Sequence, residues 1–205
     1  MSYKEERYFS IEEYKKIIAL QKDVHEVQIS EISPQDLVQL WSTTLENGMH
    51  GISFSAYEEG QKPGDIITED QVRRRMKIIA PYTKWVRSFS CTEGNEHIPV
   101  IAHELGIKTL VGAWLGDNSE VNEREIEGLI KLANEGFVDI AAVGNEVMFR
   151  KDMTEVELLD FIKRVKKAIP SSIPVGYVDN YYEFSFRFII SFVCDVILAK
   201  CYPYW

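Results

Sequence analysis

The chain has 205 residues, of which 45% are hydrophobic and 27% are charged, and its formal net charge is −9. This composition is typical of a globular protein with a buried core, and the length suits one domain or one domain with an appendage. The acidic balance argues against a nucleic-acid partner and against binding to an anionic membrane, because both need a basic surface.

The cysteines and histidines give no sign of a metal site. Three cysteines and four histidines are scattered along the chain without ligand spacing, so we predict no metal and no other cofactor. The odd number of cysteines fits reduced thiols. The first seven residues are rich in charge and no apolar segment follows them, so the sequence predicts a cytoplasmic location without a signal peptide.

Residues 1–49 differ in pattern from the rest and are predicted to form a helical leader. A capping box precedes an amphipathic helix at 11–20. A second helix is expected to begin at Ser33, which precedes a proline, and to end before Gly48. We expect this leader to pack on the bottom or side of the domain formed by residues 50–205.

From residue 50 onward, predicted strands alternate with predicted helices. The strands are expected at 50–57, 85–90, 108–116, 138–146, 174–178 and 195–199, and the helices at 68–79, 98–105, 123–133 and 155–169. This alternation is typical of βα units on a parallel sheet. The segment 184–193 is aromatic and prone to β structure, where a polar-faced helix would be expected.

Two architectures fit this alternation, an open doubly wound sheet and a (β/α)8 barrel. An open nucleotide-binding sheet normally carries a glycine-rich phosphate loop, whereas the segment 57–61 after the first strand is acidic. Polar and aromatic side chains instead follow nearly every strand, as in a barrel. These residues are Tyr57, Arg87, Trp114, Glu146, Tyr177 and Tyr202. We therefore predict an α/β fold of the (β/α)8 TIM barrel type and keep the open sheet as the less favoured alternative.

The predicted barrel is incomplete. Six strands are found where a barrel has eight, and residues 50–205 are fewer than the roughly 250 residues of a typical barrel. We therefore expect about six βα units, and the end of the chain at Trp205 suggests a fragment of a longer product. Open barrel edges are prone to pair with other chains, so self-association is expected.

The centre of the predicted site is the end of the strand at 138–146. The strand is apolar, reaches Gly144, and is followed by Asn145 and Glu146. Catalytic groups of α/β barrels lie at the C-terminal ends of their strands. A solvent-exposed carboxylate beside a turn is the simpler alternative for Glu146.

Four segments together resemble glycoside hydrolase family 17 in its bacterial branch, namely GISFSAYEEGQKPGD, WVRSFS, VGNEV and CYPYW. The resemblance covers about residues 48–205 and implies a (β/α)8 barrel that acts on β-1,3-glucan by hydrolysis or transfer. It also implies that Glu146 is the general acid/base of a retaining mechanism and that Asn145 hydrogen-bonds the sugar 2-hydroxyl. For the full-length family an extracellular location is the alternative.

The remaining strand-end residues are predicted to bind a β-glucan or oligosaccharide substrate. Tyr57, Trp114 and Tyr202 would stack on sugar faces, and Tyr177 is included in the same binding set. Arg87 would orient the nucleophile or lower its pKa. The simpler alternatives are an ion-pair role for Arg87 and ordinary core packing for the aromatic residues.

The chain departs from the family pattern in two respects. A retaining glycosidase uses two carboxyl groups about 5–5.5 Å apart, and the family's nucleophile follows a seventh strand, which this chain lacks. Lys200 also stands where the resemblance predicts asparagine. The chain alone is therefore expected to show no detectable glucanase activity. A non-catalytic fragment or pseudoenzyme that at most binds glucan is the alternative.

Overall fold

The computed structural model describes residues 32–201. The chain divides into two compact units, Met1–Thr43 and Thr44–Trp205. The helix predicted at 11–20 lies outside the described residues. The assignment of residues 1–49 to a leader and 50–205 to a barrel therefore stays a prediction.

The helix predicted after Ser33 is present as α2, Pro34–Asn47. The Ser33 hydroxyl accepts a hydrogen bond from the backbone N–H of Asp36 at 3.2 Å, which satisfies one of the free donors of the first turn. Gly48 follows the helix with φ of 76°, the left-handed conformation that commonly ends a helix. Both predicted ends of this helix are confirmed.

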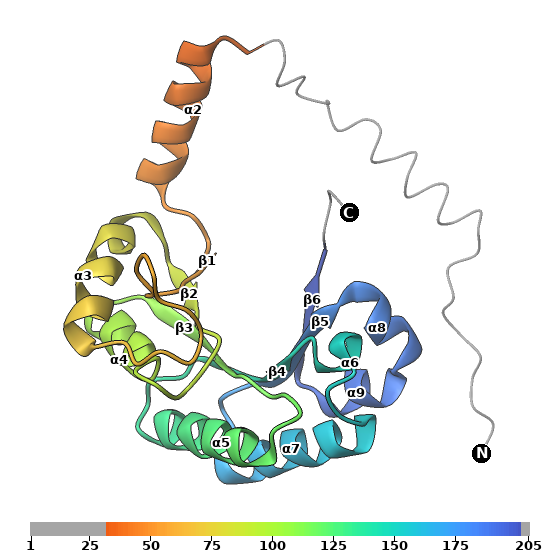
Figure 1. Cartoon of the computed structure of the whole chain (residues 1–205). Helices are drawn as coiled ribbons and strands as arrows, with labels where there is room; N and C mark the ends of the chain where they lie inside the picture. The colour runs from red at the N-terminus through yellow and green to blue at the C-terminus, as the bar shows by residue number, and fades with distance from the viewer. Residues whose placement is uncertain (1–31, 202–205) are drawn as a thin grey trace, which may run out of the picture. The chain divides into compact units, whose positions relative to one another are not determined.

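Six parallel strands form one sheet in the order β1-β2-β3-β4-β5-β6. They are β1 (Ile52–Ser53), β2 (Trp85–Arg87), β3 (Lys108–Ala113), β4 (Ile140–Asn145), β5 (Val175–Asn180) and β6 (Val196–Lys200). Each strand lies beside its successor in the sequence, and Figure 1 shows the strands curving along the inner side of a layer of helices. A doubly wound sheet would reverse its strand order at a switch point. The partial TIM barrel is therefore confirmed and the open sheet is excluded.

The helices of this unit follow the strands as βα units require. They are α3 (Glu69–Ile79), α4 (His97–Glu104), α5 (Ser119–Asn134), α6 (Val147–Arg150), α7 (Glu155–Ala168), α8 (Tyr181–Phe186) and α9 (Phe188–Val193), with a short 3-10 turn η2 at Ala80–Tyr82. Thr68 caps α3, and Thr154 begins α7 with a complete capping box. The four longer helices predicted for residues 68–169 are confirmed.

Two segments differ from the prediction. The aromatic segment at 184–193 is helical, in α8 and α9, because burial of Phe184 and Ile190 against the core outweighs its local β-propensity. Phe192 of the same segment is 92% exposed, so the segment still presents apolar surface. The four-residue helix α6 was not predicted, because so short a helix leaves no periodic pattern. The self-association expected at the open barrel edges stays a prediction.

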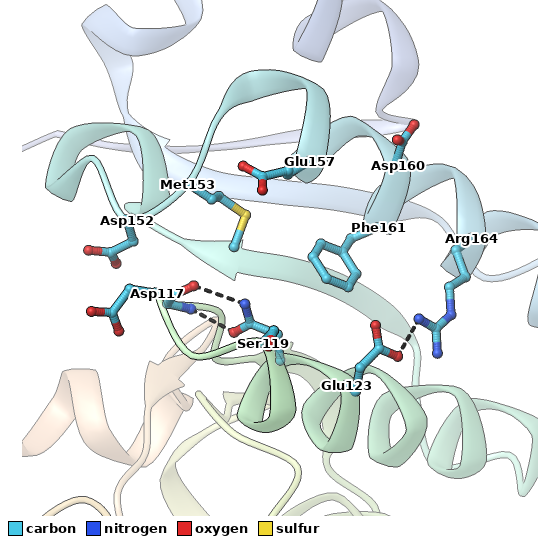
Figure 2. A pocket seen from close by; sticks show the side chains of 11 residues that line it. Asp117, Ser119, Glu123, Asp152, Met153, Glu157, Asp160, Phe161 and Arg164 are labelled. Atoms are coloured by element: carbon cyan, nitrogen blue, oxygen red, sulfur yellow. Dashed lines mark hydrogen bonds and ion pairs between the residues drawn. The ribbon is translucent and has the colours of Figure 1, made fainter.

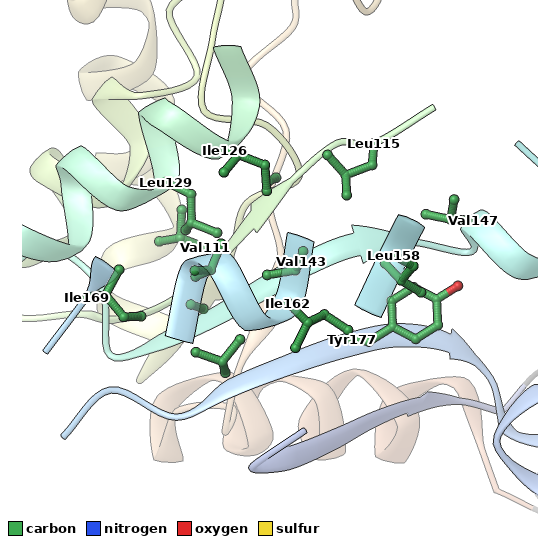
Figure 3. Packing of buried hydrophobic residues seen from close by; sticks show 14 of the residues in the cluster. Val111, Leu115, Ile126, Leu129, Val143, Val147, Leu158, Ile162, Ile169 and Tyr177 are labelled. Carbon is green, nitrogen blue, oxygen red and sulfur yellow. The ribbon is translucent and has the colours of Figure 1, made fainter. Parts of the chain in front are cut away.

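The main core lies between the sheet and the helices α5 and α7. Val111 and Val143 from the strands meet Leu129 of α5 and Leu158 of α7 in one buried cluster (Figure 3). Burial of β4 along nearly its whole length explains why its sequence is almost continuously apolar, whereas the equally buried β5 ends in Asp179 and Asn180. Within residues 32–201, helices long and apolar enough to cross a membrane are absent.

Substitution of Leu158 tests how much the packing of α7 on the sheet contributes to the free energy of unfolding. Leu158 is fully buried on α7, whereas Val156 of the same helix is 68% exposed. We expect Leu158→Ala to lower the free energy of unfolding by about 2–5 kcal/mol through the lost contacts and the cavity. The control Val156→Ala should change it by less than about 0.5 kcal/mol. Chemical denaturation of both variants measures this, and equal effects would contradict the packing described.

Candidate functional site

The turn at the end of β4 holds Glu146 in an unusual backbone conformation. Gly144 has φ of 85°, and a Cβ atom there would lie 2.8 Å from the side chain of Val147. Glu146 has φ of 54° and ψ of 29°, in the left-handed region that non-glycine residues rarely adopt. Its N–H donates to the Val178 carbonyl at 2.7 Å, and its own carbonyl accepts from Arg150 N–H at 2.8 Å. Such fixed, strained positions concentrate at functional sites.

The Glu146 side chain forms a largely buried ion pair with Lys200. Its Oε1 atom lies 3.3 Å from Lys200 Nζ, and the two side chains are 17% and 21% exposed. The pKa of Lys200 is lowered, chiefly because burial disfavours its charge, while the Glu146 carboxylate acts in the opposite direction. The pair joins the ends of β4 and β6.

Arg87 connects the end of β2 to the same turn. Its Nη2 atom donates to the Asn145 side-chain oxygen at 2.6 Å, and Asn145 is buried. The guanidinium lies 4.5 Å from the ring centre of Phe89, in a cation–π contact. Arg87 therefore fixes the orientation of the Asn145 side-chain amide, with its oxygen toward the guanidinium. Asn145 is the residue directly before Glu146.

A cavity of about 550 Å³ lies at the ends of β1, β2 and β3. Aromatic groups and polar groups line it together, which suits a ligand that has both apolar faces and hydroxyl groups. The Trp114 side chain is 40% exposed, and the Tyr57 hydroxyl accepts a hydrogen bond from Asn95 at 3.3 Å. The lining residues are Phe54, Ser55, Tyr57, Pro63, Gly64, Phe89, Ser90, Glu93, Asn95, Trp114, Val121, Arg124 and Glu125.

Glu125 supports the wall of this cavity and was not singled out from the sequence. Its carboxylate accepts hydrogen bonds from the Ser90 hydroxyl at 2.5 Å, from Cys91 N–H at 2.9 Å and from Trp114 N–H at 3.0 Å. The Thr92 hydroxyl donates to it as well, at 2.6 Å. A signal was present, because Glu125 is a carboxylate within the apolar stripe of its helix.

Arg150 connects the cavity to the Glu146 turn from the other side. Its guanidinium lies 4.7 Å from the Trp114 ring centre. The same group donates to the backbone carbonyl of Asn145 and, at 2.9 Å, to that of Leu115. Two arginines therefore connect the aromatic cavity to Asn145, the last residue of β4.

Tyr177 does not lie where the sequence prediction placed it. It is 1% exposed and belongs to the hydrophobic core, with its hydroxyl donating to Asp179 and accepting from Met148 N–H at 2.9 Å. Side chains alternate along a strand, and residue 177 points to the helix layer. Burial raises the pKa of both Tyr177 and Asp179. We correct Tyr177 from a substrate-binding to a core residue. Tyr202 lies outside the described residues.

A second pocket, of about 380 Å³, lies between the first turns of α5 and α7 (Figure 2). Met153 and Phe161 contribute apolar surface, while Glu123 pairs with Arg164 and Asn122 exchanges hydrogen bonds with the Gly116 backbone. Other polar groups of the lining bond residues outside it, such as Asp152 with Arg150 and Glu157 with Thr154. Within residues 32–201, clusters of three or more His, Cys, Asp or Glu side chains that could hold a metal ion are absent.

Comparison with known proteins places these features in context. Residues 51–205 match the family described as "BtgE/BtgC glycoside hydrolase domain". The glucan 1,3-beta-glucosidase BGL2 of Candida albicans is 21% identical over 147 residues, which cover 63% of this chain and 47% of that protein. A glucan 1,3-beta-glucosidase of Saccharomyces cerevisiae is 22% identical over 193 residues, covering 80% of this chain and 62% of that protein. The chain spans about half the length of the first of these relatives.

A solved structure resembles the fold over much of the chain. It is an active-site mutant of Rhizomucor miehei beta-1,3-glucanosyltransferase in complex with laminaritriose, with a TM-score of 0.66 and 26% sequence identity. The similarity covers 78% of this chain and 59% of that protein.

The role of Glu125 can be tested without a ligand. Replacing it by Gln exchanges a charged acceptor for an amide that cannot accept all the hydrogen bonds that the carboxylate receives. We expect Glu125→Gln to lower the free energy of unfolding by about 1–3 kcal/mol and to alter Trp114 fluorescence. The matched variant Glu127→Gln, at an exposed position of the same helix, should leave both unchanged. An unaltered unfolding midpoint in Glu125→Gln would contradict this role.

Proposed function

This chain belongs to the BtgE/BtgC glycoside hydrolase domain family, a glucanase family of the glycoside hydrolase family 17 type, and on that basis we propose that it binds β-1,3-glucan and contributes the general acid/base to its cleavage or transfer. The observation that carries the proposal is the Glu146 carboxylate, which follows β4 on a left-handed backbone, while its neighbour Asn145 is hydrogen-bonded by two arginines that lie over rings of the aromatic cavity. The names of the relatives agree with this substrate class.

Glycoside cleavage needs a proton for the leaving oxygen and a carboxylate for the oxocarbenium-like transition state. We assign the proton transfer to Glu146 and the contact with the sugar 2-hydroxyl to Asn145, whose amide is oriented by Arg87. Asp179 is not suited to be the second carboxylate, because it is fully buried and accepts hydrogen bonds from Tyr177 and from backbone N–H groups. We therefore assign the nucleophile to a seventh strand, beyond the six strands described.

The cavity at β1 to β3 is proposed to hold glucosyl units. Sugar rings present apolar C–H faces and hydroxyl edges, and the cavity offers Tyr57, Phe89 and Trp114 beside polar groups such as Asn95. The structural relative was solved with laminaritriose, which makes this trisaccharide the natural probe.

A second candidate function is glucan binding without catalysis. The Lys200–Glu146 ion pair favours it, because a general acid must carry its proton near neutral pH and a nearby ammonium favours the ionised carboxylate instead.

Binding of laminaritriose tests the proposed cavity. We expect the 205-residue chain to bind it, and Trp114→Ala to raise the dissociation constant by about tenfold, or about 1.4 kcal/mol, through lost stacking. Isothermal titration calorimetry measures both. Trp41→Ala removes an exposed tryptophan of the other unit and should leave the constant unchanged. Equal affinity of the Trp114→Ala variant and the unaltered chain would exclude this cavity as the glucan site.

Turnover of laminaritriose tests the binding-only function. We expect the 205-residue chain to bind laminaritriose without releasing shorter or longer oligosaccharides, because the described strands supply one suitably placed carboxylate. Chromatography of the products after incubation measures this. Product formation that disappears in Glu146→Gln would show that both carboxylates are present and would exclude the binding-only function. Product formation that persists in Glu146→Gln would contradict the role of this residue.

A further inference from the structure

An ion pair joins Glu146, directly after β4, to Lys200 at the end of β6. We propose that Lys200 is a positioning residue that keeps Glu146 in its carboxylate form, so that proton donation by Glu146 requires this pair to open. The inference rests on the proposed function of Glu146 for its consequence, while the pair itself is observed in the structure and can be tested separately.

The backbone places the two groups opposite each other. Lys200 is the last residue of β6, and its Cα partner in the parallel ladder is Asn180 at the end of β5. Glu146 N–H is bonded to Val178 of the same β5 strand at 2.7 Å. Both side chains therefore start from positions fixed by one strand, and their charged atoms meet at 3.3 Å.

Burial strengthens the attraction between the two charges of this pair. Exposed pairs are screened by water and contribute little, whereas the Glu146 and Lys200 side chains are only 17% and 21% exposed. The Lys200 ammonium therefore favours the ionised form of Glu146, and its removal moves the balance toward the protonated acid.

Other charged and titratable groups surround the pair. Arg87 from β2 disfavours the ammonium of Lys200, and Asp179 from β5 favours it. Tyr182 of α8 interacts with the Glu146 charge as well. Arg87 is also hydrogen-bonded to Asn145, directly before Glu146. Lys200 itself forms an ion pair with the Glu146 carboxylate at 3.3 Å.

The pair has a clear chemical consequence. As a carboxylate, Glu146 can accept a proton or stabilise positive charge, but it has no proton to give to a leaving oxygen. Opening of the pair, by a bound ligand that displaces the ammonium or by acid that protonates the carboxylate, restores the donor. A neutral side chain at position 200 removes this requirement.

Titration of Glu146 by NMR tests the inference. In the 205-residue chain with 13C-labelled glutamate, the Glu146 signal is assigned by its absence in Glu146→Gln. We expect its titration midpoint to move to higher pH by about 1 or more in Lys200→Gln, because the stabilising charge is lost. Lys200→Arg keeps the charge and should keep the midpoint near that of the unaltered chain. An unchanged midpoint in Lys200→Gln would overturn the inference.

Two controls keep the result interpretable. Lys163→Gln removes an exposed lysine of α7 and should not move the midpoint. The reciprocal experiment follows the side-chain signal of Lys200 in Glu146→Gln. Because Glu146 raises the pKa of Lys200, the Lys200 midpoint should lie at lower pH in this variant than in the unaltered chain. An unchanged Lys200 titration would also contradict the pair. Both readouts are independent of sugar, so loss of laminaritriose binding would contradict the proposed function and leave this inference standing.

Discussion

Parallel pairing of six strands in their sequence order is the constraint on which the candidate site depends. Because all strands run the same way, their C-terminal ends lie at one edge of the sheet. Residues more than fifty positions apart in the chain meet there, because Arg87 of β2 contacts Asn145 and Lys200 of β6 contacts Glu146. No local signal in the sequence could bring these charges together without that topology.

The site concentrates features that are costly elsewhere in a protein. Glu146 has a left-handed backbone, and Glu125 is a carboxylate almost completely withdrawn from water. Each is stabilised by its surroundings: two backbone hydrogen bonds hold the Glu146 turn, and four donors satisfy Glu125. The core beneath, between the sheet and α5 and α7, is by contrast apolar and regular (Figure 3). Apolar residues of this core stabilise the fold, whereas the strained and buried polar residues shape the site.

Two arginines connect the aromatic rings of the cavity to Asn145. Arg87 lies over Phe89 and bonds the Asn145 side chain, while Arg150 lies over Trp114 and bonds the Asn145 backbone. Each guanidinium uses its flat face toward an aromatic ring and its N–H edge toward an oxygen, which an ammonium group cannot do as well. A sugar bound against Trp114 would therefore be coupled to the geometry of the residue beside Glu146. Both arginines thus connect rings of the aromatic cavity to Asn145, directly before Glu146.

The sequence by itself determined the βα alternation, the helix caps and the position of Glu146 at a strand end, because apolar periodicity, capping residues and glycine stops are local signals. It also identified Tyr57, Arg87 and Trp114, which the structure places around the cavity and the β4 turn. Tertiary structure alone decided the rest. Tyr177 is a core residue because the pleat turns it toward the helices, and 184–193 is helical because two of its side chains are buried. The hydrogen bonds of Glu125 to Ser90 and Cys91 and the Lys200–Glu146 pair join residues from different βα units. Such contacts follow from strand order and register rather than from sequence neighbours.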